Sequence, residues 1–403
     1  MRIGMMADIY KPYVSGVTIH IEMIKKYLES SGHTVYIFTF GDDDYVDNEE
    51  NVIRSPGLSI DLPAVEGGIQ INMRYDRYAR ELLGSMDIVH THHPFISGML
   101  AMRYCKPRGI PIVFTNHTRY DLYYQAYLPM LPDNLGENLL QVYFPYFFKS
   151  CDLVIAPSTG MGEVLQGLGV DADLAIVPNG IDVEFFRERS SRMSRAEMDI
   201  EEDEAVLIYV GRLGPEKNID FLLRGFANAI DSFEKGRLLL VGDGPDREKS
   251  ERLVKELGIY DNVIFAGAVD YQDVPGYLGI ADAFVTASYT EVHPLTLMEG
   301  TAVGLPSLGI RSPGIEDIIQ DGQTGYLVNN DFDEFSDGML RLLRDGDDRQ
   351  RMSELAYIKA ERFSIEESCH LLMQHYYELV DGIEKKDVMR GGKIKKLRSR
   401  LKI

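Results

Sequence analysis

Two sets of short apolar runs, each alternating with helical patterns, constrain the fold of this chain more than any other sequence feature. Runs of strand length that alternate with helical segments predict a parallel sheet covered by helices on both faces. We therefore expect an α/β chain with two doubly wound, Rossmann-like domains. The expected strands are 2–7, 34–40, 87–92, 111–117, 153–158 and 174–179 in the first half, and 205–211, 236–242, 262–267, 283–288, 306–310 and 325–328 in the second.

The chain length agrees with two domains, because 403 residues are many for a single hydrophobic core. The polar run "RERSSRMSRAEMDIEEDEA" at 187–205 has little to bury and marks the expected boundary. We predict a first domain over 1–186 and a second over 187–363, followed by a helical pattern and a basic tail over 364–403. A ligand is expected beyond the carboxyl ends of the strands and between the domains.

Composition excludes several classes of function. The formal net charge of −21 argues against general nucleic-acid binding, since a polyanion would be repelled. Three scattered cysteines fit a reducing cytosol and form neither a disulfide framework nor a zinc motif. We see no signal peptide and no apolar run long enough to cross a membrane.

The stretch "TEVHPLTLMEG" at 290–300 predicts a strand, a loop and a helix in sequence. Pro294 has no N–H group and fits the first turn of a helix, so Glu291 would lie in the loop and Glu299 inside the helix. The N–H groups of Leu295 and Thr296 would then face the loop, where a helix N-terminus favours an anion. A phosphorylated ligand that carries hydroxyl groups would suit both carboxylates.

Two further segments of the second half follow expected strands. In "GRLGPEKN", Arg212 and Lys217 flank a Gly-Pro turn, and two cations beside a helix start make a diphosphate site. The alternative is a surface loop with two solvated cations. In "VGDGPDR", Gly242 would let the backbone approach a ligand, which is a weak signal when taken alone.

The first half offers two weaker signals. Gly16, in "YKPYVSGVTIH", lies between the first strand and its helix and would allow a phosphate to approach. His117, in "FTNHT", stands at the carboxyl end of a strand. A lone histidine is more often structural than functional, although the strand end favours the functional interpretation.

Together these motifs resemble one family. The ordered set "GRLGPEKN", "GDGP", the Glu291-to-Glu299 element followed by "GTAVGLP", and "VPNGID" at 177–182 is similar to the family 4 retaining glycosyltransferases of the GT-B fold. The resemblance covers nearly the whole chain. It implies two Rossmann-like domains that face a cleft, an acceptor site mainly on the first, a nucleotide-sugar site mainly on the second, and a last helix that crosses back to the first domain.

The resemblance also implies roles for residues at the matching positions. Arg212 and Lys217 would hold the donor diphosphate, Glu299 would accept hydrogen bonds from the ribose, and Glu291 would contact the transferred sugar. His117 would touch that sugar from the opposite domain. Gly16 would bring backbone N–H groups to the diphosphate. The leaving phosphate would take the acceptor proton, with retention at the anomeric carbon.

One departure from the family pattern concerns the donor sugar. His293 and Pro294 stand where the family commonly has an aromatic or small polar residue followed by glycine. Proline removes one N–H group near the sugar, and His293 is either a new sugar contact or a packing residue. We expect no cofactor and no metal, because the acidic runs at 42–44 and 345–348 belong to predicted turns away from the site.

The acceptor is expected from two features. The first domain carries a dense aromatic segment over 120–148 that includes Tyr120, Tyr123 and Tyr124, and it forms either a packed core or an apolar acceptor channel. The tail "KIKKLRSRLKI" alternates apolar residues with cations, as an interfacial helix on anionic lipid does. The solvated alternative stays open for its cations, Lys393, Lys395, Lys396 and Arg398.

The stretch "VFTNHTRYDLYYQAY" at 113–127 resembles the bacterial diacylglycerol glucosyltransferases of the family. The resulting hypothesis is transfer of a hexose, with UDP-glucose as the favoured donor, to a membrane lipid such as diacylglycerol. It places the protein in the cytoplasm, peripherally on the inner face of the membrane. The alternatives are a soluble acceptor and a non-catalytic nucleotide-sugar scaffold, and the oligomeric state stays open.

Overall fold

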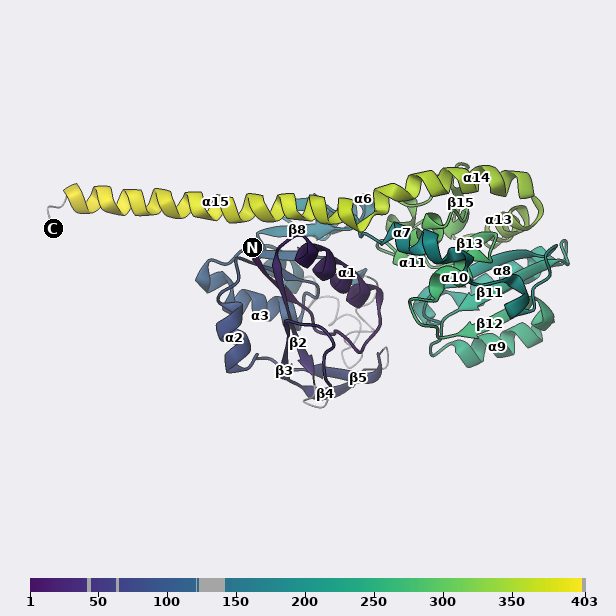
Figure 1. Cartoon of the computed structure of the whole chain (residues 1–403), viewed down its shortest axis with the longest axis horizontal. Helices are drawn as coiled ribbons and strands as arrows, with labels where there is room; N and C mark the ends of the chain where they lie inside the picture. The colour runs from purple at the N-terminus through teal and green to yellow at the C-terminus, as the bar shows by residue number, and fades with distance from the viewer. Residues whose placement is uncertain (42–44, 63–64, 121, 123–141, 401–403) are drawn as a thin grey trace. The chain divides into compact units, whose positions relative to one another are not determined.

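The computed structural model describes residues 1–41, 45–62, 65–120, 122 and 142–400, with side chains described over 1–41, 45–58, 72–120, 122 and 142–382. The chain forms two compact units (Figure 1). Unit 1 comprises Met1–Pro157, Gly162–Val177 and the chain from Glu366 onward, and unit 2 comprises Ser158–Met161 and Pro178–Ile365. The main division falls at Val177, ahead of the predicted boundary at residue 186.

Within the described residues, unit 1 is built on a parallel sheet in the order β3-β2-β1-β6-β7-β8-β9. Each strand expected in the first half is present, and the carboxyl ends were predicted one to three residues too long in most cases. The strands are β1 (Arg2–Met6), β2 (Thr34–Gly41), β3 (Val52–Pro56), β6 (Ile88–Thr91), β7 (Ile112–Thr115), β8 (Leu153–Ala156) and β9 (Leu174–Ile176). The helices are α1 (Gly16–Ser30), α2 (Arg77–Leu83), α3 (Ile96–Tyr104), the 3₁₀ turn η1 (Lys106–Arg108), and α6 (Thr159–Gly167), which begins in unit 2.

The strand order reverses at β1. Strand β1 pairs with β2 on one side and with β6 on the other, so that the loops leaving β1 and β6 turn to opposite faces of the sheet. Such a topological switch point is where doubly wound sheets bind ligands. The edge of the sheet differs from the prediction, because β3 and the antiparallel hairpin of β4 (Leu58–Leu62) and β5 (Val65–Ile71) were not foreseen.

The last helix, α15 (Ile365–Arg400), returns to unit 1, as the family resemblance implied. Its buried residues recur every three or four positions, at Cys369, Leu372 and Tyr376, which is the apolar stripe of an amphipathic helix. The Tyr376 hydroxyl lies 2.6 Å from Nδ1 of His90, a residue of β6. Figure 1 shows α15 as the long yellow helix lying along unit 1.

Unit 2 repeats the architecture with a parallel sheet in the order β12-β11-β10-β13-β14-β15, within the same described ranges. Its strands are β10 (Ala205–Val210), β11 (Gly236–Val241), β12 (Val263–Gly267), β13 (Ala283–Thr286), β14 (Ser307–Ile310) and β15 (Gly325–Val328). The strand order reverses at β10, between β11 and β13. All six residues of β10 are buried, as a strand covered on both faces requires.

Helices cover both faces of this second sheet, and the apolar faces of α8 and α13 pack together over it through Phe226, Phe335 and Leu342. The helices of unit 2 are α7 (Val183–Arg189), α8 (Ile219–Ile230), α9 (Arg247–Glu256), α10 (Val274–Gly279), α11 (Leu295–Ala302), α12 (Pro313–Glu316), α13 (Phe332–Arg344) and α14 (Gly346–Lys359). Short 3₁₀ turns connect them, namely η2 (Ser190–Arg192), η3 (Arg195–Met198), η4 (Pro215–Lys217), η5 (Tyr260–Asn262) and η6 (Ala360–Phe363).

Across the described part of the chain, no helix combines the length and the apolar character that crossing a bilayer requires.

Candidate active site

The loops that follow β10 and β13 meet at the switch point of the second sheet. Nζ of Lys217, at the end of η4, donates a hydrogen bond of 2.7 Å to Oε1 of Glu291. The two side chains are 25% and 14% exposed, so this ion pair is largely withdrawn from water. The sequence placed both residues in the site, and the structure brings them into direct contact.

Opposing effects set the charge of Lys217. Burial by itself lowers the pKa of the ammonium, but the neighbouring Glu291 carboxylate outweighs it and raises the pKa above the usual value. Lys217 is therefore a fixed cation at any physiological pH. A buried pair of this kind is costly to break from one side, because the remaining charge loses its partner.

Arg212 lies beside this pair in sequence but is more open to solvent. Its side chain is 41% exposed and contacts the Glu216 carboxylate at 3.5 Å. Its main-chain carbonyl accepts a hydrogen bond of 2.9 Å from the buried Tyr209 hydroxyl. The backbone of Arg212 is thus fixed, while its guanidinium group remains within reach of a ligand.

Three hydrogen bonds hold the main chain of the Glu291 loop. Gly314 N–H donates to the carbonyl of Glu291 at 3.1 Å, and the Ser158 hydroxyl donates to that of Val292 at 2.8 Å. Nδ2 of Asn179 donates to the carbonyl of His293 at 2.9 Å. Asn179 belongs to the "VPNGID" motif, so the structure gives that motif a function in shaping this loop.

Helix α11 begins after Pro294, which occupies the N-cap, so its first N–H groups belong to Leu295 and Thr296 as predicted. Glu299 lies inside this helix and is 1% exposed. The Tyr271 hydroxyl donates to Oε1 of Glu299 at 3.1 Å. Burial raises the pKa of the Glu299 carboxyl to about 7, and the hydrogen bond from Tyr271 opposes that rise.

His293 is buried within unit 2. Its ring packs edge to face against Phe363, with the ring centroids 5.9 Å apart. Packing is thus part of its function at this position.

The predicted glycines divide into two kinds. A Cβ atom on Gly242 would lie 2.0 Å from the carbonyl oxygen of Gly211, and its φ of +136° also favours glycine. The fold alone therefore explains Gly242. Gly16 is different, because a Cβ atom there would meet nothing within 4 Å. Gly16 starts α1, behind the N-cap Ser15, and close packing does not account for a glycine there.

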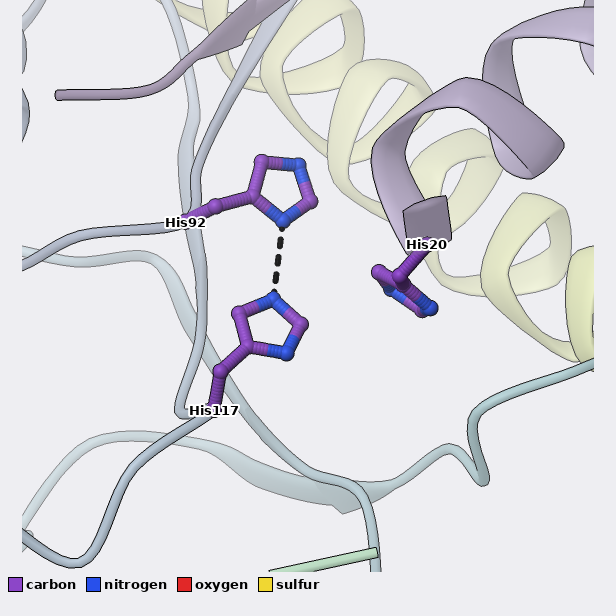
Figure 2. Close-up of side chains that lie close together, drawn as sticks. All are labelled: His20, His92 and His117. Atoms are coloured by element: carbon purple, nitrogen blue, oxygen red, sulfur yellow. Dashed lines mark hydrogen bonds between the residues drawn. The ribbon is translucent and has the colours of Figure 1, made fainter. Parts of the chain in front are cut away.

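In unit 1, His117 follows β7 and belongs to a group of histidines at the carboxyl ends of the strands (Figure 2). Its Nε2 lies 3.0 Å from Nδ1 of His92, and the two rings stack with their centroids 5.3 Å apart. Burial, followed by the charge of His20, lowers the pKa of the His117 imidazole well below its ordinary value. His117 is neutral near pH 7 and hydrogen bonds as a neutral ring.

Sequence reasoning found His117 but missed His20 and His92. Strand β6 ends one residue before His92, and His20 lies one helical turn after Gly16, so only the three-dimensional fold brings them to His117. The repeated histidines of "VHTHHP" at a predicted strand end were the available signal.

The aromatic segment is largely core where the structure describes it. Tyr120 is 4% exposed, and it packs against Phe95 and Phe144. Phe147 and Phe148 are buried as well, whereas Tyr146 is 66% exposed. Tyr123 and Tyr124 lie outside the described residues, and so do the side chains of Lys393, Lys395, Lys396 and Arg398.

The acidic run at 345–348 caps a helix. Asp345 accepts the N–H of Asp348 at the start of α14, and Asp348 accepts the hydroxyl of Tyr326 and pairs with Arg351. Asp345 and Asp348 are thus engaged in holding the helix start. The run at 42–44 lies outside the described residues.

Comparison with known proteins agrees with this arrangement. "Glycosyltransferase Family 4" matches residues 14–185, and "Glycosyl transferases group 1" matches residues 190–359. Alpha-monoglucosyldiacylglycerol synthase from Acholeplasma laidlawii is 30% identical over 402 residues, covering 96% of this chain and 99% of the relative. The protein of the same name from Streptococcus pneumoniae is 30% identical over 381 residues, covering 90% and 83%.

Among solved structures, sucrose-phosphate synthase from Thermosynechococcus elongatus superposes with a TM-score of 0.77 at 21% identity, covering 94% of this chain and 99% of the other. At that identity the likeness shows the fold alone, and it agrees with two Rossmann-like domains. The full-length relatives at 30% identity, the two matched families and the fold together show that this chain belongs to the family 4 glycosyltransferases of the GT-B fold and is a nucleotide-sugar-dependent glycosyltransferase.

Proposed function

We propose that the protein transfers glucose, with retention of configuration, from UDP-glucose to a diacylglycerol-type lipid. The observation that carries the donor half is the Lys217–Glu291 pair at the switch point of unit 2, with buried Glu299 on the adjoining helix. The sugar and the lipid are those in the names of the two full-length relatives.

The positive charges of unit 2 suit a diphosphate. Arg212 and Lys217 would bind its oxygens, and the N–H groups of Leu295 and Thr296 add the positive end of α11. A fixed cation stabilises the charge that develops as the nucleotide leaves. Because these groups supply the positive charge, we propose that transfer needs neither a cofactor nor a metal ion.

The two carboxylates would recognise hydroxyl groups. Lys217 and the hydrogen bonds of its loop hold Glu291, so that its carboxylate can accept a hydrogen bond from a hydroxyl group of the transferred sugar at a fixed position. Glu299 would accept hydrogen bonds from the ribose hydroxyl groups, and such bonds favour the ionised form of its carboxyl. Since the pKa of the free carboxyl is raised to about 7, we expect nucleotide binding to weaken as the pH falls below that value.

Transfer exchanges one bond for another at the anomeric carbon. The bond from this carbon to the diphosphate oxygen breaks, and the acceptor hydroxyl oxygen forms a new bond on the same face. The acceptor proton passes to the leaving diphosphate. His117 would contact the sugar as a neutral imidazole, and the backbone at Gly16 would approach the diphosphate.

A lipid acceptor agrees with the surface near the aromatic segment of unit 1. Val142 and Tyr146 are 75% and 66% exposed and stand four residues apart on one helical segment, so that they share a face. Leu122 is also exposed, as is Lys149, whose cation would favour an anionic surface. We propose that the enzyme works in the cytoplasm on the inner face of the membrane, and that the basic tail contributes to its attachment.

Nucleotide diphosphate release from a panel of UDP- and GDP-sugars tests this proposal, with and without vesicles of diacylglycerol and an anionic phospholipid. We expect release from UDP-glucose that is stimulated by the vesicles. Release that ignores lipid but responds to soluble sugars would replace the lipid acceptor by a soluble one. Donor binding without turnover under any condition would indicate a non-catalytic scaffold.

A further inference from the structure

Three imidazoles converge in unit 1 from three separate segments of the chain. His20 comes from α1, His92 from the loop after β6 and His117 from the loop after β7 (Figure 2). One ring nitrogen from each lies within 4.8 Å of the others. His20 and His92 are buried, and His117 is partly exposed.

Two nitrogen atoms of this cluster lack a hydrogen-bond partner among the described residues. These atoms are Nδ1 of His20 and Nε2 of His92, and both are buried. Buried polar atoms without a partner are rare and costly. Because the other nitrogen of His92, Nδ1, faces His117, an ion between the rings would take that nitrogen, and of the two unpartnered atoms only Nδ1 of His20 could be satisfied by it. This observation is independent of the convergence of the rings.

The rings are also held in place by their surroundings. His90 stacks on His92 with ring centroids 4.2 Å apart. His90 is itself fixed by the Tyr376 hydroxyl at 2.6 Å and by the Thr115 hydroxyl at 2.7 Å. A site whose side chains are already positioned loses less conformational entropy when a ligand binds.

We propose that His20, His92 and His117 bind a divalent transition-metal ion of the zinc class. Three histidines are a known donor set for zinc and leave a fourth position to water or another oxygen. The all-nitrogen set disfavours Mg²⁺ and Ca²⁺, which take oxygen ligands.

The geometry needs only small adjustments. Tetrahedral zinc with bonds of about 2.0–2.1 Å holds two ligand nitrogens roughly 3.4 Å apart. Nδ1 of His92 and Nε2 of His117 are 3.0 Å apart. One set of nitrogens, with one from each ring, lies within 4.8 Å. Side-chain rotations that move a nitrogen by roughly an ångström would therefore complete the site.

The proton balance is simple. Imidazole binds a metal ion in its neutral form, in which each ring offers one lone pair and keeps one N–H group. The hydrogen bond between His92 and His117 contains one N–H group. When the ion takes both nitrogens, that proton moves to the other nitrogen of the same ring, and no net proton is released.

One consequence rests on the proposed function. His117 would contact the transferred sugar, and the same imidazole cannot hold a metal ion and the sugar in the same way. The ion is therefore expected to inhibit transfer, and a chelator is expected to restore it. Metal binding itself does not depend on this consequence.

The binding test uses the chelator-treated full-length chain, titrated separately with Co²⁺, Zn²⁺ and Mg²⁺. We expect one equivalent of Co²⁺ to bind with the intense visible absorption of a tetrahedral site. Zn²⁺ should displace the bound Co²⁺, whereas Mg²⁺ should not. His92→Gln and His117→Gln are each expected to weaken binding more than about tenfold. The matched control is His375→Gln, on α15 and outside the cluster, which should bind like the wild type.

The outcomes separate the two proposals. Absence of Co²⁺ binding, an octahedral spectrum, or unchanged binding in both His92→Gln and His117→Gln would overturn the metal site while leaving the transferase intact. Each variant is checked by circular dichroism, and using two variants guards against misfolding in one of them. Metal binding without turnover on any sugar donor would support the site and contradict the proposed function.

Discussion

The two units place different side chains at the same point of the same topology. In unit 2, the loops after β10 and β13 bring Lys217 and Glu291 together as a charged pair. In unit 1, helix α1 after β1 and the loop after β6 carry His20 and His92, and the loop after the neighbouring strand β7 adds His117. These three rings are neutral near pH 7. A switch point is thus a place for a ligand, and the residues grafted there decide whether it suits a diphosphate or a neutral contact.

The largest effect on turnover is expected from a variant that breaks the Lys217–Glu291 pair. Lys217→Ala removes the cation from the proposed diphosphate site and leaves the Glu291 carboxylate, 14% exposed, without this partner. We expect turnover of the sugar donor to fall by about 100- to 1,000-fold, as when a stabilising donor is removed from an active site. Release of nucleotide diphosphate measures this loss.

Lys235→Ala is the matched control for this experiment. Lys235 also pairs with a carboxylate in unit 2, that of Asp203, but its side chain is 63% exposed. Exposed pairs contribute little, so turnover should stay within about twofold of the wild type. Near-normal turnover in Lys217→Ala would remove Lys217 from the proposed site.

The second prediction concerns the buried carboxyl of unit 2. The pKa of Glu299 is 4.5 in the unfolded chain and about 7 in the folded one, so between these values the folded chain keeps a proton that the unfolded chain has released. The free energy of unfolding therefore decreases as the pH rises through this window and levels off above it. Glu299→Gln should remove this contribution, which amounts to about 3 kcal/mol.

Urea unfolding at several pH values measures the difference between Glu299→Gln and the wild type. The variant should gain stability relative to the wild type from pH 4.5 to 7. Glu354→Gln, an exposed carboxylate on α14, should follow the wild-type curve. A constant difference across the window would mean that Glu299 is ionised throughout.

The charged switch point was easier to predict from the sequence than the neutral one. Arg212, Lys217, Glu291 and Glu299 follow strands with a clear apolar pattern, and proline marks the start of α11, so short-range patterns were enough. The cluster in unit 1 joins His20, His92 and His117, whose proximity depends on the pairing of β1, β6 and β7. No local pattern encodes that pairing.

Two other misses have similar causes. Strand β3 is mostly half-buried, and the sequences of β3, β4 and β5 lack the continuous apolar run of a central strand, so their pattern was weak. The function of Asn179 was also hidden, because its partner is a main-chain carbonyl at His293. Every residue has a main-chain carbonyl, so the residue type at position 293 gives no sign that its carbonyl accepts this hydrogen bond.

A third prediction concerns the neutral network of unit 1. Tyr376→Phe removes the hydroxyl that lies 2.6 Å from Nδ1 of His90, and it leaves a buried imidazole nitrogen without that partner. We expect a loss of about 2 kcal/mol in the free energy of unfolding, with turnover per folded molecule unchanged. Chemical unfolding and donor turnover below the transition measure the two effects.

The neighbouring residue provides the control for this variant. Tyr377 is 49% exposed and contacts His33 through its ring, which phenylalanine keeps, so Tyr377→Phe should be close to neutral. If Tyr376→Phe slowed turnover in the folded protein, the hydrogen bond to His90 would affect the reaction as well as stability. The contrast between a charged site in unit 2 and a neutral supporting network in unit 1 would then be weaker.

The smallest expected effect is Tyr271→Phe, the counterpart of Tyr376→Phe in unit 2. In unit 2 the tyrosine hydroxyl donates to a carboxylate, so its loss acts through the charge of Glu299 and raises the pKa of this carboxyl further. The decline of stability with pH should then extend above pH 7, by an amount worth about 1 kcal/mol. The urea series used for Glu299→Gln detects it, and Tyr260→Phe, 63% exposed, is the control. A shift of the window to lower pH would show that the hydroxyl does not favour the ionised carboxyl. A shift to higher pH would show that the Tyr271 hydroxyl tunes the charge of unit 2, whereas its counterpart in unit 1, the Tyr376 hydroxyl, contacts an imidazole that is neutral near pH 7.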